Sequence, residues 1–221
     1  MGSSNNASIQ EAIALESDLY GDILQEDFID SYRNLTYKAI MGLKWTSKHC
    51  PNARYVLKTD DDIFVNIFNV INHLQGLDRL GPSLNRTILC LVWSRMKVVR
   101  EPTSKWYIPK SEFWPDYFPH YCSGSAFIYT GDLAGDLYQS SLHTPFFWVD
   151  DYYVTGLLAS NVGATLMKLN PLYALSPKQF LERFTANNTW HTLTFGHVHD
   201  LNWWLQIWNN VLKERVHSLI Y

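Results

Sequence analysis

The chain has 221 residues, of which 47% are hydrophobic and 18% charged, and its formal net charge is -3. This length and composition suffice to bury a hydrophobic core, which excludes a disordered or low-complexity protein. The 18 Lys and Arg residues are scattered rather than gathered in a basic stripe, which argues against a nucleic-acid partner. No apolar run reaches the roughly 18 residues that a membrane-spanning helix needs.

The chain is expected to hold a flexible leader over residues 1–15 and one compact domain over residues 16–221. The first periodic pattern predicts a helix over 31–49, with Asp30 as its N-terminal cap and Pro51 after its end. The apolar residues of this pattern recur every three or four positions: Phe28, Tyr32, Leu35, Ala39, Ile40 and Leu43.

Strand-like and helix-like segments then alternate. Short apolar runs predict strands at 55–59, 87–93, 125–130 and 165–169, and amphipathic patterns predict helices at 66–75, 132–142 and 150–160. A final helix follows, with an apolar face made by Leu201, Trp204, Leu205, Trp208, Val211 and Leu212. This alternation predicts an α/β sandwich around a mostly parallel central sheet.

Three cysteines, Cys50, Cys90 and Cys122, leave two states open, either one disulfide with one free thiol or three free thiols. Sequons for N-glycosylation begin at four asparagines, which is more than chance supplies in a chain of this length. They are Asn6, Asn34, Asn85 and Asn187. Their number favours a lumenal protein.

The first candidate site is an acidic cluster directly after the predicted strand at 55–59. Asp60 and Asp62 are two positions apart, so in extended chain their side chains can point the same way. Carboxylates at the carboxyl end of a sheet strand suit Mg²⁺ or Mn²⁺ bridged to a substrate phosphate. The alternative is a solvated acidic turn. An EF-hand is excluded because Val65 stands where that loop needs glycine.

The second candidate is the carboxylate pair Asp150 and Asp151 at the start of a predicted helix. The pair could simply cap the helix and complement its dipole. If Asp151 is instead a general base, the dipole is expected to keep it ionised but weak, so that it needs a hydroxyl within hydrogen-bond reach. A third candidate is His197 or His199, each of which could ligate a metal or serve the structure.

Four segments support a more specific interpretation. Residues 27–38, 58–66, 119–127 and 149–156 are similar to the patterns "DFxDsYxNLTxK", "KxDDDxFVN", "YPxYcsGxgy" and "EDVYvxG". In this order and spacing, over about residues 16–212, they resemble the inverting β-1,3-galactosyltransferase and β-1,3-N-acetylglucosaminyltransferase family of Golgi enzymes. The resemblance implies a GT-A-type, Rossmann-like fold, a UDP-hexose donor and Mn²⁺ as cofactor.

The resemblance also implies roles for single residues on the donor side. Asp62 takes the place of a direct metal ligand, and Asp60 and Asp61 lie near the metal or the donor. His197 takes the place of the second metal ligand, because it stands eleven residues before Trp208 in the final helix.

Further roles follow from the same resemblance. Asp151 takes the place of the general base, and Gly124 lies beside the transferred sugar. Arg100 and Lys105 stand in a stretch similar to the family's "R...sKWyv", where a cation could meet the donor diphosphate.

The resemblance implies transfer in one displacement from a UDP-hexose, galactose or N-acetylglucosamine, to a glycan hydroxyl with a β-1,3 linkage. The acceptor would be carried by a glycoprotein or glycolipid. Trp148 and Tyr152 are candidate acceptor contacts, together with Trp106 and Tyr121, because flat rings suit the CH faces of sugars. Tyr152 departs from the family, which usually has Val at this position.

The chain lacks a counterpart of the family's first strands, and it is expected to be the C-terminal two thirds or so of the catalytic domain. The full-length form would be a type II protein of the Golgi membrane, whose anchor is absent from this chain. A catalytically weak, lectin-like relic is the main alternative. A phosphatase nucleophile at Asp60-x-Asp62 is disfavoured because Phe64 stands where that motif needs Thr or Val.

Overall fold

A computed structural model describes residues 1–81, 84–185, 194–198 and 200–220. The α-helices are α1 (Ala7–Tyr20), α2 (Leu35–His49), α3 (Ile67–Leu80), α4 (Leu133–Ser141), α5 (Asp150–Tyr152), α6 (Ala159–Asn161), α7 (Pro177–Thr185) and α8 (Leu201–Ile220). Three other helical turns are η1 (Tyr32–Asn34), the π-helix η2 (Tyr153–Leu158) and η3 (Asn170–Leu172). The strands are β1 (Tyr55–Thr59), β2 (Ile63–Val65), β3 (Thr87–Trp93), β4 (Tyr121–Thr130), β5 (Thr165–Lys168), β6 (Tyr173–Ala174) and β7 (Phe195–His197).

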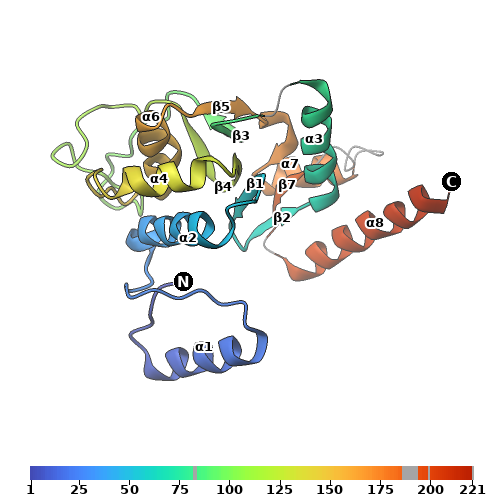
Figure 1. Cartoon of the computed structure of the whole chain (residues 1–221), viewed down its shortest axis with the longest axis horizontal. Coiled ribbons are helices and arrows are strands. Elements are labelled where there is room, and N and C mark those ends of the chain that lie inside the picture. Colours follow the sequence, from blue (N-terminus) through green and yellow to red (C-terminus); the bar gives the residue numbers. More distant parts are fainter. Residues whose placement is uncertain (82–83, 186–193, 199, 221) are drawn as a thin grey trace.

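The central sheet has the strand order β1-β4-β3-β5. β4 lies between β1 and β3 and runs antiparallel to both, whereas β3 and β5 are parallel. The α/β class is therefore confirmed, but the sheet is mixed rather than mostly parallel, because β4 returns against the direction of both its neighbours. Figure 1 shows α1 set apart from the sheet at one end and α8 extending away at the other.

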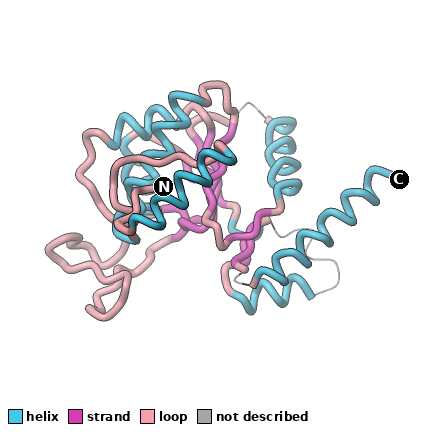
Figure 2. The backbone as a smooth tube through the Cα atoms, turned by 90° about the horizontal axis from the view of Figure 1, so that it is seen from below, coloured by secondary structure: helices cyan, strands magenta, loops and turns pink. Residues whose placement is uncertain are grey.

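Helices cover both faces of this sheet (Figure 2). In β3, Ile88 and Cys90 belong to the same buried cluster as Leu133 of α4, and the intervening Leu89 belongs to the cluster that contains Val70 of α3. The alternation follows from the two-residue period of a strand, which turns successive side chains to opposite faces. The apolar runs that predicted β3 and β4 are thus strands buried between two layers of helices, whereas β1, at the edge of the sheet, is only partly buried.

The N-terminal region differs from the prediction. Residues 7–20 form α1, which the analysis of the sequence did not anticipate. Asp30 does not cap the following helix, because its carboxylate accepts a hydrogen bond from Gly2 N (2.9 Å) and pairs with Lys38 (3.0 Å). That helix, α2, begins at Leu35, after the single turn η1.

A second sheet, with strand order β2-β7-β6, lies beside the first, and its short strands were not predicted. Trp204 and Trp208 of α8 pack against its buried cluster, as expected. Leu201, Leu205 and Leu212, which the helical pattern assigned to the same apolar face, are instead 70%, 49% and 38% exposed. The predicted apolar face was only partly right, because only a narrow stripe of α8 is buried.

Cys90 and Cys122 form a disulfide between β3 and β4, and Cys50 is free. This settles the pairing that the sequence left open. Among the described residues, no helix combines the length and the apolar composition needed to cross a membrane. The sequon at Asn187 and the imidazole of His199 lie outside the described residues.

Candidate active site

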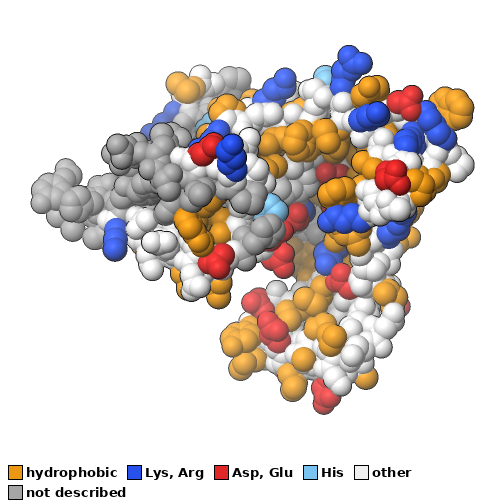
Figure 3. All heavy atoms as spheres, turned by 180° about the vertical axis from the view of Figure 1, so that it is seen from behind, with side chains coloured by type: hydrophobic (Ala, Val, Ile, Leu, Met, Phe, Trp, Pro, Cys, Tyr) orange, Lys and Arg blue, Asp and Glu red, His pale blue; other side chains and the backbone are white. Residues whose placement is uncertain are grey.

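A cavity of about 1300 Å³ opens at the carboxyl end of β1. Figure 3 shows a hollow on this face, with acidic side chains and a histidine on one side and basic and hydrophobic side chains on the other. Most of the predicted site residues line the cavity: Asp60, Asp61, Asp62, Gly124, Trp148, Asp151 and His197. Segments far apart in the sequence therefore meet at one place.

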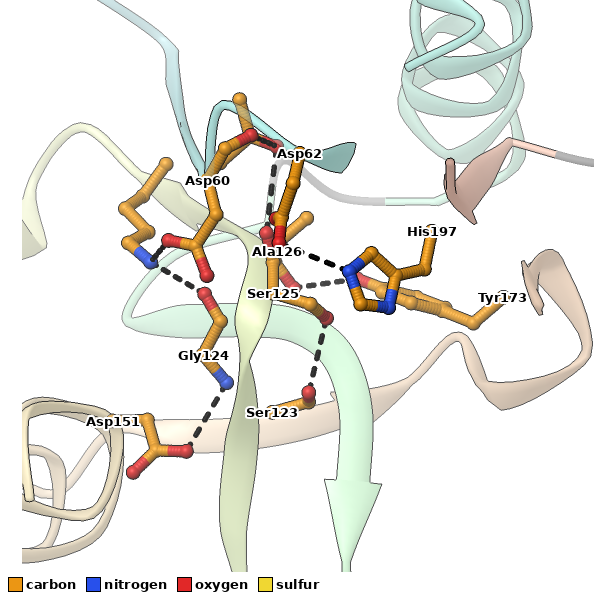
Figure 4. A network of polar contacts seen from close by, with 11 residues as sticks. Asp60, Asp62, Ser123, Gly124, Ser125, Ala126, Asp151, Tyr173 and His197 are labelled. Carbon is orange, nitrogen blue, oxygen red and sulfur yellow. Dashed lines mark hydrogen bonds and ion pairs between the residues drawn. The ribbon is translucent and has the colours of Figure 1, made fainter. Parts of the chain in front are cut away.

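One wall of the cavity is the turn between β1 and β2. Asp60 N donates to Ser125 O of β4 (3.0 Å), and Ile63 N closes the turn on Asp60 O (3.3 Å). β2 pairs antiparallel with β7 in a register that sets Ile63 opposite His197, so Asp62 lies next to that imidazole. Asp62 Oδ2 and His197 Nε2 are 2.9 Å apart (Figure 4).

The Asp62–His197 pair fits a divalent cation. A separation of 2.9 Å suits two neighbouring ligands that each lie about 2.1 Å from an ion. Asp60 and Asp61 line the same cavity, but in the described part of the chain no three His, Cys, Asp or Glu side chains gather at one point. A cation held here would therefore have room for further oxygen ligands, such as substrate phosphates or water.

The opposite wall is built on an irregular stretch of β4. Two steps along β3, from Cys90 to Val92, correspond to five steps along β4, from Phe127 to Cys122. The extra residues of β4 bulge out of the ladder and carry Gly124 into the cavity. Bulges of this kind commonly direct groups toward active sites.

Gly124 lies against the carboxylate of Asp151. Gly124 N donates to Asp151 Oδ2 (3.2 Å), and Tyr152 N donates to Oδ1 (2.7 Å). A Cβ atom added to Gly124 would lie 3.2 Å from the Cβ of Asp151. A side chain at position 124 would therefore fit only if Asp151 or the backbone moved by a few tenths of an ångström, and the two N–H donors fix the orientation of the carboxylate.

Burial, followed by the charge of Asp150, raises the pKa of Asp151 to about 7. The prediction that the helix dipole keeps Asp151 ionised and weak is wrong, because burial outweighs the dipole. The helix it starts, α5, is also only three residues long before the π-helix begins. A carboxylate with a pKa near 7 can accept a proton near neutral pH and is a competent general base.

Lys58 belongs to the motif at residues 58–66, but no role could be predicted for it from the sequence. This residue of β1 lines the cavity, and its Nζ contacts both the carboxylate of Asp60 and the carbonyl oxygen of Gly124. No local sequence signal could have identified these contacts, because they depend on the pairing of β1 with β4.

The predicted aromatic contacts to the acceptor are mostly buried. Trp148 is 6% exposed and lies under the Arg33 guanidinium, 4.1 Å from the ring centre. Tyr152 is 4% exposed and packs against Phe113 and Phe118. Neither residue offers an open ring face, so the structure does not support their prediction as sugar platforms.

The open aromatic surface of the cavity belongs to another pair. Tyr32 and Trp106 line the cavity and are 45% and 53% exposed, and Trp106 Nε1 donates to Tyr32 Oη (2.8 Å). Trp106 was among the predicted sugar contacts, whereas Tyr32 was predicted only as part of the apolar pattern of a helix. Lys105 Nζ lies near both rings, 5.3 Å from the centre of Tyr32 and 4.7 Å from that of Trp106, and the exposed parts of the two rings face the cavity.

The two predicted diphosphate contacts do not line the cavity. The Arg100 guanidinium donates to the carbonyl oxygens of Ile108 (2.6 Å), Phe113 (2.7 Å) and Pro115 (2.6 Å), so it holds together the loop before β4. Lys105 Nζ lies over the Trp106 ring, 4.7 Å from its centre. The assignment of Arg100 to the donor is therefore replaced by a structural role.

Comparisons with known proteins agree with the motifs. The family model described as Galactosyltransferase matches residues 1–170. The chain is 32% identical over 217 residues to "Beta-1,3-galactosyltransferase 1" of Mus musculus and of Homo sapiens, which covers 97% of the chain and 63% of those proteins. It is 34% identical over 170 residues to "Beta-1,3-galactosyltransferase 5" of Homo sapiens, covering 77% of the chain and 53% of that protein. The chain thus spans less than two thirds of the length of these relatives.

Proposed function

The chain belongs to the galactosyltransferase family, and from this membership we propose that it transfers a hexose, galactose in the first place, from a UDP-sugar to an acceptor glycan. The main support for the proposal is a single cavity with carboxylates on two walls, in different surroundings on each. The Asp62–His197 pair forms one wall, and the Asp151 carboxylate oriented by Gly124 forms the other. Donor binding and proton transfer each require one of these walls.

The donor is proposed to bind at the Asp62–His197 wall. These two side chains would hold Mn²⁺ or Mg²⁺, and Asp60 and Asp61 would contact its water or the donor. The bound cation would offset the negative charge that develops on the departing UDP.

Asp151 is proposed as the general base. The acceptor hydroxyl would lie within hydrogen-bond reach of the Asp151 carboxylate, whose orientation is fixed by the N–H groups of Gly124 and Tyr152. Asp151 takes the hydroxyl proton as the oxygen attacks the anomeric carbon from the face opposite UDP. One displacement inverts the α-linked donor to a β-linked product, and no second carboxylate nucleophile is needed.

The acceptor is proposed to contact the exposed pair Tyr32 and Trp106. The Tyr32 hydroxyl lies in the field of the Asp150 and Asp151 carboxylates, which contribute to its raised pKa after burial. The pair therefore lies on the side of the general base, where an attacking sugar must approach. Flat rings with a polar edge suit the apolar face of a sugar ring and its rim of hydroxyls.

The finer parts of the proposal come from the named relatives and from the family resemblance. A β-1,3 linkage follows the names of the relatives, and N-acetylglucosamine remains a second candidate donor sugar. The Cys90–Cys122 disulfide supports a lumenal site in the Golgi, because disulfides persist in oxidising compartments. The raised pKa of Asp151 favours an enzyme over a lectin-like relic, because sugar binding alone needs no group that titrates near pH 7.

The test is transfer of labelled galactose from UDP-galactose to a panel of sugar acceptors by the purified chain, with and without Mn²⁺. We expect a β-linked product whose formation needs Mn²⁺ and is lost in Asp151→Asn. UDP-N-acetylglucosamine run in parallel identifies the donor sugar. Undetectable UDP binding, or transfer that continues in Asp151→Asn, would contradict the proposal.

A further inference from the structure

A chain of polar contacts leads from the donor-side wall to the general base. Lys58 Nζ contacts the Asp60 carboxylate on one side and the Gly124 carbonyl oxygen on the other. The N–H of the same glycine donates to Asp151 Oδ2 (3.2 Å). Figure 4 shows these contacts running between the acidic turn and Asp151 through one residue of β4.

Gly124 is the residue that most needs such support. It lies in the bulge of β4, where the regular ladder with β3 is interrupted, and it carries no side chain that could anchor it. Its carbonyl group is held by Lys58 and its N–H group by Asp151, so both of its backbone polar groups point at functional side chains. Releasing the carbonyl would free the rotation of the backbone beside the N–H that orients Asp151.

The charges around the cavity indicate that Lys58 has an electrostatic role in addition to its contact with Gly124. Five carboxylates line the cavity: Asp60, Asp61, Asp62, Asp150 and Asp151. Two other lysines line it, of which Lys38 is paired with Asp30. Lys58 is the cation placed between the two acidic walls, and its side chain is 29% exposed.

We propose that Lys58 is a positioning residue, which clamps the Gly124 bulge so that Asp151 stays aligned for proton transfer and joins this alignment to the donor-side carboxylate Asp60. The inference rests on the proposed function of the site and adds to it a residue that contacts neither the acceptor nor the reacting atoms. Lys58 acts through the backbone of Gly124: it contacts the carbonyl oxygen, and the N–H of the same residue orients Asp151.

The charged and titratable groups around Asp151 determine the direction in which its pKa should change when Lys58 is replaced. Asp150 on the same helix raises the pKa of Asp151, and the charge of Lys58 lowers it. The buried hydroxyl of Tyr121 on β4 and the Tyr32 hydroxyl on η1 also lie in its field. Removing the charge of Lys58 is therefore expected to move the pKa of Asp151 further upward.

The experiment compares Lys58→Met and Lys58→Arg with the matched surface variant Lys48→Met, which lies on an exposed part of α2. For Lys58→Met we expect kcat to fall about 100-fold, and the acid limb of the pH profile of kcat to move upward. Lys58→Arg, which keeps the charge and the donor hydrogens, should recover activity to within about tenfold. Lys48→Met should match the wild type.

Asp60→Asn separates the two contacts, because it removes the ion pair of Lys58 but leaves its contact with Gly124. We expect a higher KM for the donor without the upward move of the acid limb. An unchanged acid limb in Lys58→Met, or a loss that lies wholly in the donor KM, would overturn the positioning role. Equal activity of Lys58→Arg and Lys58→Met would overturn it as well.

A titration of the Asp151 carboxyl by ¹³C NMR, assigned with Asp151→Asn, tests the same point without turnover. The midpoint in Lys58→Met, or in Lys58→Gln if the first variant does not fold, should lie above that of the wild type. An unchanged midpoint contradicts the inference even if no transfer is observed. Absence of transfer by the wild type with a raised midpoint would instead count against the proposed function alone.

Discussion

The two walls of the cavity place the same kind of side chain in opposite surroundings. On the donor-side wall, the side chains of Asp60 and Asp62 are 47% and 48% exposed and contact Lys58 and His197. On the other wall, Asp151 is partly buried beside a second carboxylate, and its pKa rises to about 7. Exposed carboxylates are available to a cation, whereas a more buried one can take a proton near neutral pH. In the proposed mechanism, the degree of burial rather than the residue type therefore separates the two tasks.

The largest expected effect is on the Asp151 wall. Asp151→Asn keeps the size of the side chain but removes its basicity, so we expect transfer to fall by 10³-fold or more. Because the donor is proposed to bind at the other wall, its dissociation constant should change less than about threefold. Single-turnover kinetics together with calorimetric titration of UDP measure both quantities. An equal loss of UDP binding would show that donor binding and proton transfer are not separated between the two walls.

The next largest effect is expected at the Asp62–His197 pair. Asp62→Ala and His197→Ala each remove one of the paired donor atoms, and we expect both Mn²⁺-dependent UDP binding and transfer to weaken by about 10- to 100-fold. His143→Ala, an exposed histidine after α4, serves as the matched control. If only transfer were lost and UDP bound as in the wild type, the pair would not belong to the donor wall.

Gly124→Ala perturbs the geometry of the base without touching its charge. The added Cβ would lie 3.2 Å from the Cβ of Asp151, so one of the two must move by a few tenths of an ångström. We expect kcat to fall about 10- to 100-fold. Gly135→Ala, whose new Cβ meets nothing closer than 3.9 Å, is the control and should keep wild-type activity. Full activity of Gly124→Ala would contradict the tight fit.

The smallest effect concerns stability. Because the folded-state pKa of Asp151 is raised from 3.8 to about 7, its contribution to stability is fully present below pH 4 and is lost as pH rises through 7. Asp151→Asn removes this cost, so the variant should be more stable than the wild type at pH 8 by about 1 to 3 kcal/mol. Thermal unfolding should show the gain at pH 8 and little of it at pH 4, because the cost builds up between the unfolded-state and folded-state pKa values. An equal gain at both values would rule out titration of Asp151 as its cause.

Much of the fold was predictable because the patterns are local. The helix ending at His49 and the strand Tyr55–Thr59 follow from apolar spacing and from the break at Pro51. The strands β2, β6 and β7 were not predicted, because a strand of two or three residues is too short to show an alternating pattern of apolar and polar side chains. Their pairing also joins segments far apart in the chain. The same limit hid the direction of β4, which depends on its neighbours rather than on its own residues.

The site was predicted in its residue types and less well in its environments. Asp62, His197, Asp151 and Gly124 meet in one cavity, in agreement with the motifs that named them. The basicity of Asp151 was misjudged because burial is a property of the packed fold. Similarly, the sequence indicates that Trp148 is aromatic but not that its ring is buried.

The central claim is that a carboxylate with a pKa near 7 accepts the acceptor proton. The most direct measurement is the pH profile of kcat/KM for the acceptor, at saturating UDP-sugar and Mn²⁺. We expect a tenfold rise per pH unit below about pH 7 and a plateau above it, with the residual activity of Asp151→Asn independent of pH in this range. A wild-type profile that is flat between about pH 5.5 and 8 would contradict it.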